Sequence, residues 1–312
     1  MEAGWIKYLR SLPNTELLGD DAAVIGSSLI TVDMLTEGVD FILAETSPLL
    51  IGRKALAVNL SDIAAMGGIP RWIFTAVALP AGSLVLPQDM ITPDTFAPDI
   101  LAKAIFAGMQ PLIDKYGLIL AGGDTNTWDG GLVISVTVIG EVSPFGIFRR
   151  SGCQPRDKII VTGQLGGSIL GHQFLFEPRI SEALYLNRHS AVHAAMDISD
   201  GLTLDLSRML TESGRLGATL YETQIPVSSD AVKLSLQTGR SPLEHSLSDG
   251  EDFELLLSVE PNEAVRLLTQ QPLMPQYGVR LYEIGEITAE SGMRLRRADA
   301  SLQSIEPKGF EH

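Results

Sequence analysis

The chain has 312 residues, with 38 acidic and 23 basic side chains and a formal net charge of −15 at pH 7. This length is typical of one large domain or of two domains of about 150 residues each. No cluster of Lys or Arg interrupts the acidic composition, which argues against nucleic acid as a partner. The single cysteine, Cys153, excludes an intrachain disulfide. No signal peptide or apolar span of about 20 residues is visible, so we expect a cytoplasmic protein without a membrane partner.

Short apolar runs alternate with longer amphipathic ones, which indicates an α/β or α+β architecture. In the first half, strands are expected over 22–25, 29–35, 73–79, 118–121 and 132–142, and helices over 48–66 and 98–116. In the second half, we expect a strand over 159–162, a helix after Gly167, a strand ending at Asp197, a helix from Leu202, a strand over 252–259 and a helix from Pro261.

A segment rich in Pro and Gly over 143–157 marks the expected junction between two domains. The predicted domains are 1–145, for ATP and Mg²⁺ binding and dimerisation, and 150–312. A loop rich in Pro and Ser, 80–93, is predicted to be either a lid or a passive surface loop.

Several common catalytic motifs are absent from the sequence. No lysine follows a glycine, which excludes the P-loop, and no glycines are spaced as in the Gly-x-Gly-x-x-Gly of dinucleotide folds. His-Glu-x-x-His and Gly-x-Ser-x-Gly are missing as well, so zinc peptidases and ordinary α/β-hydrolases are poor fits.

Aspartates recur beside glycine or at the ends of expected elements. They are Asp20, Asp21, Asp33, Asp62, Asp124, Asp197, Asp200 and Asp252. Carboxylate oxygens that converge from several loops are the ligands that Mg²⁺ prefers. Each of these aspartates, taken alone, is equally typical of a turn or a helix N-cap.

Asp62 departs from those simple explanations. It is expected in the last turn of the helix over 48–66, where the helix dipole disfavours an acidic side chain by about 0.3–1 kcal/mol. Its neighbours are almost all apolar, so a bound cation is at least as good an explanation as a surface position. Asp33 interrupts an apolar run at the expected end of a strand, and Asp124 follows two glycines at the end of a short one.

An acidic protein binds an anionic nucleotide only through local basic groups or metal ions. Arg149 and Arg150, just before the second predicted domain, are candidate phosphate ligands, although a solvated pair at a junction fits equally well. The glycines of 163–168 precede a helical stretch and are predicted to present backbone amides to phosphate.

These segments resemble the thiamine-monophosphate kinases, within the superfamily of aminoimidazole ribonucleotide synthetase-like ATP-binding enzymes. The matching stretches run in family order: Gly19-Asp20-Asp21-Ala22, Asn59 to Gly67, Gly122-Gly123-Asp124-Thr125, Arg150-Ser151-Gly152, Asp197 to Leu202, Gly250 to Leu255 and Gly309-Phe310. The resemblance implies a two-domain α/β (α+β) fold whose N-terminal domain pairs in a homodimer, with ATP near the dimer interface. It also implies ATP-dependent phosphorylation of thiamine monophosphate to thiamine diphosphate, with several Mg²⁺ ions.

The resemblance also implies roles for individual residues. The implied Mg²⁺ ligands are Asp21, Thr31, Asp33, Asp62, Asp124, Asp197 and Asp200. The implied ATP contacts are Gly123, Asp124, Arg150 and Ser199. Glu251 and Phe310 match positions that contact thiamine phosphate. No residue is expected to act as a general base, because the acceptor phosphate, with a second pKa of about 6, is already ionised.

Two positions depart from the family pattern. Val32 stands where the family has a hydroxyl side chain, so it is expected to reach a metal only through its backbone carbonyl. Asp40 aligns with the family's substrate-contacting histidine, and a carboxylate there is expected to repel a phosphate unless a cation intervenes. Two alternatives therefore stay open. One is another ATP-using enzyme of the superfamily, such as an aminoimidazole ribonucleotide synthetase or a hydrogenase-maturation dehydratase, and the other is a non-catalytic Mg-ATP sensor.

Overall fold

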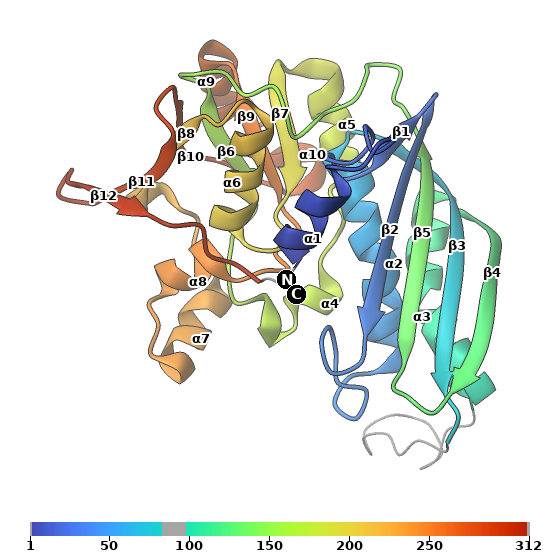
Figure 1. Ribbon diagram of the computed structural model, residues 1–312. Helices are drawn as coiled ribbons and strands as arrows, with labels where there is room; N and C mark the ends of the chain where they lie inside the picture. Colours follow the sequence, from blue (N-terminus) through green and yellow to red (C-terminus); the bar gives the residue numbers. More distant parts are fainter. Residues whose placement is uncertain (1, 83–97, 311–312) are drawn as a thin grey trace.

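The structure is a computed structural model that describes residues 2–82 and 98–310. Figure 1 shows two β-sheets with helices packed between and around them. In the described part of the chain, no helix has the length and apolar character needed to cross a membrane. The predicted loop over 80–93 lies almost wholly outside the described residues.

The first sheet contains five strands in the order β1-β2-β5-β3-β4. Its strands are β1 (Ala23–Ile25), β2 (Ser28–Thr36), β3 (Ile69–Pro80), β4 (Ile119–Trp128) and β5 (Val133–Glu141). Neighbouring strands are antiparallel except β3 and β4, which are parallel. The strand β4 is therefore an edge strand of this sheet.

Two long helices pack against one face of the first sheet, α2 (Pro48–Ala65) and α3 (Pro98–Tyr116). The side chain of Ser47 accepts a hydrogen bond from the amide of Leu49, and Pro48 occupies the first turn, so the predicted start of this helix is confirmed. Fourteen of the eighteen α2 residues are buried, because the helix also packs against α4, α5 and β7 of the second half. One hydrophobic cluster accordingly contains residues of both halves, such as Leu60 and Leu186.

The second sheet contains seven strands in the order β12-β11-β8-β10-β6-β9-β7. Its strands are β6 (Lys158–Thr162), β7 (Val192–Asp197), β8 (Gly217–Tyr221), β9 (Leu255–Val259), β10 (Leu281–Thr288), β11 (Gly292–Arg296) and β12 (Leu302–Ile305). The described helices outside the first sheet are α1 (Glu2–Leu9), α4 (His172–Leu175), α5 (Ile180–His189), α6 (Leu202–Glu212), α7 (Ser229–Thr238), α8 (Pro242–Ser248), α9 (Pro261–Gln270) and α10 (Met274–Tyr277), with short 3₁₀ turns η1 (Ser168–Leu170) and η2 (Glu222–Gln224).

The predicted α/β (α+β) class is confirmed, but several predicted strand limits were wrong. The strand predicted over 118–121 continues to Trp128, because every residue from Gly122 to Trp128 has a parallel partner in β3. Asp124 is therefore inside a strand and not at its end, and Asp33 is likewise inside β2. The strand predicted from Asp252 begins only at Leu255.

Candidate functional site

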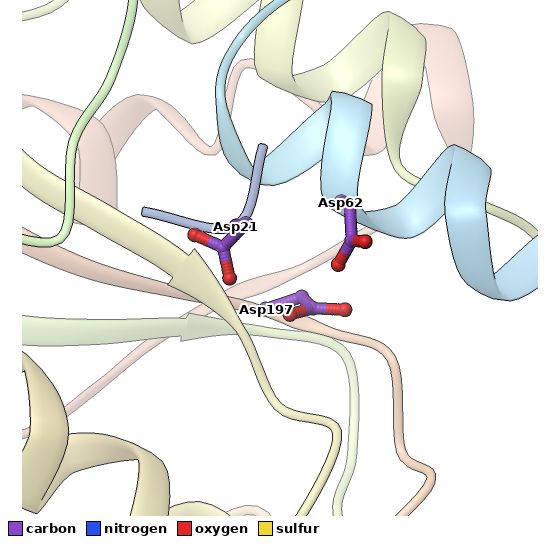
Figure 2. A group of neighbouring side chains, drawn as sticks. All are labelled: Asp21, Asp62 and Asp197. Atoms are coloured by element: carbon purple, nitrogen blue, oxygen red, sulfur yellow. The ribbon is translucent and has the colours of Figure 1, made fainter. Parts of the chain in front are cut away.

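Three aspartate side chains converge at the junction of the two halves. Asp21 lies in the loop before β1, Asp62 in the last turn of α2 and Asp197 at the end of β7. Each offers a carboxylate oxygen, and these oxygens all lie within 4.8 Å of one another. Figure 2 shows the three carboxylates pointing toward a common centre from three different segments. The sequence predicted all three as Mg²⁺ ligands, and the fold brings them together.

Neighbouring groups hold this carboxylate cluster in place. The hydroxyl of Thr31 donates to Asp62, and the hydroxyl of Ser61 donates to Oδ2 of Asp197 at 2.5 Å. Arg150 contacts Asp21 with two nitrogens, Nε at 3.1 Å and Nη2 at 2.6 Å from Oδ1. Among the described residues, Arg150 is the guanidinium that contacts this cluster, where it faces several acidic groups.

The cluster retains unpartnered acceptors. The Oδ2 atoms of Asp21 and Asp33 are buried and have no hydrogen-bond partner among the residues that the structure describes. An unsatisfied buried carboxylate oxygen is costly, and a hard cation with oxygen ligands relieves that cost. The donor set of carboxylates and a threonine hydroxyl is therefore a good fit for Mg²⁺.

The raised pKa values of the clustered carboxyl groups also favour a bound cation. Burial raises the pKa of Asp62, and the charges of Asp33, Asp197 and Asp21 raise it further. Burial and the charge of Asp21 likewise raise the pKa of Asp197. Burial is also the largest cause for Asp33, whose pKa rises to about 6 although a hydrogen bond with Asp62 opposes the shift. A divalent cation bound between such carboxylates would favour their ionised forms, because its charge offsets their mutual repulsion.

The strand β2 contributes to the site from alternate residues. Thr31 and Asp33 lie on the face that carries α2, whereas Val32 lies on the opposite face and is 64% exposed. The side chain of Val32 therefore points away from the carboxylates, which leaves its backbone carbonyl as the group available to a metal.

The segment after β7 carries two more predicted residues, Ser199 and Asp200, which line the same cleft. The backbone amides of Asp200 and Gly201 donate to Oδ2 of Asp205 at 2.9 and 3.0 Å, which fixes the turn into α6. Arg208, one turn further along α6, forms ion pairs with both Asp200 and Asp205. The sequence analysis did not predict Asp205 and Arg208 as site residues. Their positions in the first two turns of the helix that follows Asp200-Gly201 were the available signal.

A buried lysine joins two predicted substrate residues on the other side of the cleft. Lys54 is fully buried, and its ammonium lies 2.5 Å from Oε1 of Glu251, 2.9 Å from the backbone oxygen of Asp40 and 2.8 Å from Oε1 of Gln173. It also lies 5.1 Å from the ring centroid of Phe174. The sequence analysis missed Lys54, yet Lys54, Val58 and Asp62 follow the i, i+4, i+8 spacing of one helix face.

The side chain of Asp40 forms a hydrogen bond within its own loop. Its Oδ2 accepts a hydrogen bond from the amide of Thr36 at 2.6 Å. The carboxylate that was expected to repel a phosphate is thus tied to the backbone of its loop, next to the cationic Lys54. Lys54 thus bonds the backbone of Asp40 and forms its ion pair with Glu251.

Phe310 also lines this cleft, 50% exposed, and its amide donates to the backbone oxygen of Asp200 at 2.9 Å. The cleft thus brings together, from both halves, all predicted site residues except two. Its members are Asp21, Thr31, Val32, Asp33, Asp40, Asp62, Arg150, Asp197, Ser199, Asp200, Glu251 and Phe310.

The two exceptions are Gly123 and Asp124. Both lie on β4, which is separated from β2 by β5 and β3, a distance of about 14 Å at about 4.8 Å per strand. Asp124 is exposed, and the register aligns it through Ala76 and Ser135 with the exposed Met34. It therefore lies on the sheet face opposite α2 and α3, and the fold of one chain does not bring it to the carboxylate cluster.

The glycine segment over 163–168 has a different role from the predicted one. The amides of Gly166 and Gly167 donate to the carboxylates of Asp252 and Asp249 at 2.8 and 3.2 Å. They are thus used inside the chain and do not face the carboxylate cluster. Arg149 forms an ion pair with Asp20 and is half exposed, as the alternative of a solvated residue at the junction predicted.

Comparison with known proteins agrees with this fold. Two family models match, "AIR synthase related protein, N-terminal domain" over residues 19–142 and "AIR synthase related protein, C-terminal domain" over residues 147–297. Thiamine-monophosphate kinase of Rhodopirellula baltica is 39% identical over 100% of this chain and 97% of its own length. The Bacillus subtilis thiamine-monophosphate kinase is 32% identical over 95% of this chain and 92% of its own.

A solved structure supports the same assignment. The structure of AaThiL complexed with AMPPCP and TMP superposes with a TM-score of 0.81 at 25% identity, covering 100% of this chain and 96% of that one. The two-domain aminoimidazole ribonucleotide synthetase-like fold expected from the sequence is thus confirmed. Because these two relatives are 39% and 32% identical over nearly the whole chain, the chain belongs to the thiamine-monophosphate kinase family.

Proposed function

We propose that the protein transfers the terminal phosphoryl group of ATP to thiamine monophosphate and so forms thiamine diphosphate and ADP. The observation that carries the proposal is the convergence of Asp21, Asp62 and Asp197 beside unpartnered buried oxygens. This cluster lies in one cleft with Arg150 and Phe310. A relative that is 39% identical over the whole chain bears the name of this kinase.

The proposed Mg²⁺ ligands are Asp21, Thr31, the carbonyl of Val32, Asp33, Asp62, Asp124, Asp197 and Asp200. Bound there, Mg²⁺ ions neutralise phosphate charge and align donor and acceptor oxygens. The chain itself contributes Arg150, whose guanidinium is held beside Asp21 and faces the same cleft, for contact with nucleotide phosphates. Ser199 and Gly123 are proposed as further nucleotide contacts.

The proposed thiamine phosphate contacts are Asp40, Glu251 and Phe310. Asp40 acts through its loop, because its carboxylate is occupied by the amide of Thr36. Glu251 is held by Lys54 at the edge of the cleft. The phenyl ring of Phe310 offers a half-exposed aromatic surface for a heteroaromatic ring.

We assign the nucleotide, metal and pairing functions to residues 1–145 and the remaining part of the site to residues 150–312. The pairing surface is the face of the first sheet opposite α2 and α3, where Val32, Met34 and Ile119 are 64%, 62% and 59% exposed. Exposed apolar residues gathered on one sheet face are typical of a protein interface. The cytoplasmic location stays a prediction from the sequence.

In a homodimer formed through this face, Asp124 of one subunit is proposed to complete the site of the other. Mixing two inactive variants, Asp62→Asn and Asp124→Asn, tests this arrangement by subunit exchange. A heterodimer then contains one site with both aspartates intact, so an equal mixture is expected to regain about one quarter of the wild-type rate. If the two aspartates act within one chain, the mixture stays as inactive as its components.

The function itself is tested by product analysis. Purified protein is incubated with Mg-ATP and thiamine monophosphate, and thiamine diphosphate and ADP are quantified together. Equal amounts of both products are expected, with no orthophosphate. ADP with orthophosphate but no thiamine diphosphate would contradict the substrate, and Mg-dependent ATP binding without turnover would favour a nucleotide sensor.

A further inference from the structure

The carboxyl-terminal segment, residues 306–310, runs from β12 back across the molecule to the cleft. Figure 1 shows this path as the red trace that leaves β12. Its main chain is attached to the start of α6. The amide of Lys308 donates to Oγ1 of Thr203 at 3.0 Å, and the amide of Phe310 donates to the backbone oxygen of Asp200.

Thr203 is the side chain that makes this attachment. Its hydroxyl accepts from the amide of Lys308 and lies 2.9 Å from the backbone oxygen of the same residue, so its single hydrogen is shared between that oxygen and the one of Leu247. It also lies 3.0 Å from the backbone oxygen of Leu247. Thr203 is 3% exposed, so water does not replace these bonds easily.

The close fit of the segment to α6 supports the same conclusion. A Cβ atom on Gly309 would overlap the backbone oxygen of Asp200 and the side chain of Leu204. The segment therefore lies directly on the turn that carries Ser199 and Asp200. The Thr203 hydroxyl is not needed to cap α6, because Asp205 already accepts the amides of Asp200 and Gly201.

We propose that Thr203 is a positioning residue whose hydroxyl fixes the register of residues 306–310 and so places Phe310 in the thiamine phosphate pocket. The proposal rests on the proposed function in one respect, the contact between Phe310 and that substrate. The described part of the segment has no helix or strand after Ile305, so its hydrogen bonds to α6 and the preceding turn contribute to the position of Phe310.

The test compares Thr203→Val, which keeps the shape and removes the hydroxyl, with Thr203→Ser, which restores it. Thr288→Val is the matched control, since Thr288 is the last residue of β10 and its hydroxyl bonds the backbone oxygen of Glu290, away from the cleft. Thr203→Val is expected to raise the KM for thiamine monophosphate about fivefold, with kcat and the KM for ATP unchanged. Thr203→Ser and Thr288→Val are expected to match the wild type.

A second readout needs no substrate. Trypsin cleaves after Lys308, and intact mass reports the loss of the last four residues. Thr203→Val is expected to accelerate this cleavage about fivefold, because the released segment becomes accessible to the protease. Gly309→Ala displaces the segment without touching the hydroxyl and is expected to accelerate it as well.

Unchanged cleavage in Thr203→Val would overturn the proposal. So would faster cleavage with an unchanged KM, provided that Phe310→Ala itself raises the KM. In the double variant Thr203→Val/Phe310→Ala, the KM is expected to equal that of Phe310→Ala alone, because the hydroxyl acts through the ring. If the wild-type protein forms no thiamine diphosphate, the proposed function fails, and the cleavage assay alone then decides whether Thr203 holds the segment.

Discussion

Replacing Asp62 with Asn is expected to lower kcat/KM about 10³-fold while making the metal-free protein more stable. The first effect follows from the loss of a charged ligand at the centre of the carboxylate cluster. The second follows because Asp62 is buried beside Asp33, Asp197 and Asp21, whose charges oppose its ionisation. A variant that loses activity through misfolding would instead lose stability.

The pH dependence gives the sign of the stability effect. The folded-state pKa of Asp62 lies above its unfolded value of about 3.9, so the folded protein binds more protons between the two values. The stability of the metal-free wild type therefore falls as the pH rises through that window, and it falls less in Asp62→Asn. Urea unfolding in a chelator at pH 5 and pH 8 measures this difference.

Asp114→Asn is the control for this experiment, because Asp114 lies on α3 and bonds only Gln110 through its side chain among the described residues. It is expected to keep the wild-type rate and stability. Added Mg²⁺ is expected to raise the unfolding midpoint of the wild type and of Asp114→Asn, but much less that of Asp62→Asn. Full activity of Asp62→Asn at limiting Mg²⁺ would contradict the assignment of the metal site.

Within the carboxylate cluster, Asp62 stood out in the sequence because its signals were local, whereas the metal roles of Asp21 and Asp197 rested on the family resemblance. Ser47 and Pro48 define the start of α2, and the helix period then places Asp62 in the last turn among apolar neighbours. An acidic residue at that position conflicts with the helix dipole, so one segment alone favours a nearby cation, which stays a prediction.

Local sequence signals could not predict how far Asp124 lies from the carboxylate cluster. Its distance from Asp62 depends on the strand order, which places β4 at the sheet edge, parallel to β3. Sequence pattern gives the existence of a strand but not its neighbours or the face that a given residue occupies. The same limit applies to the amides of Gly166 and Gly167, whose acceptors lie more than 80 residues away in sequence.

For Lys54, the sequence signal was a lysine within an apolar helix, and this signal was ambiguous. A lysine in an apolar helix is usually explained by a solvated end of its long side chain. Here the ammonium is fully buried instead, because Glu251, Gln173 and the backbone oxygen of Asp40 provide one acceptor for each of its three N–H groups. None of these acceptors is near Lys54 on the same element, so the pairing follows from the packing of both halves around α2.

Replacing Lys54 with Met is therefore expected to lower the free energy of unfolding by about 3 kcal/mol. The methionine fills the space of the aliphatic stem, but it leaves the carboxylate of Glu251 without its cation. Burial raises the pKa of Glu251 and Lys54 opposes that rise, so removing the lysine shifts this pKa further upward. Lys115→Met is the matched control: its pair with Glu177 is about half exposed and is expected to contribute less than about 1 kcal/mol.

The double variant Lys54→Met/Glu251→Gln separates charge from packing. If the uncompensated carboxylate causes the loss, the neutral amide is expected to restore most of the stability, as measured by urea unfolding at pH 8. Restored stability without restored turnover of thiamine monophosphate would agree with the proposed contact between Glu251 and that substrate. A loss in Lys54→Met no larger than in Lys115→Met would contradict the prediction, because it would mean that water reaches Glu251 once the lysine is gone.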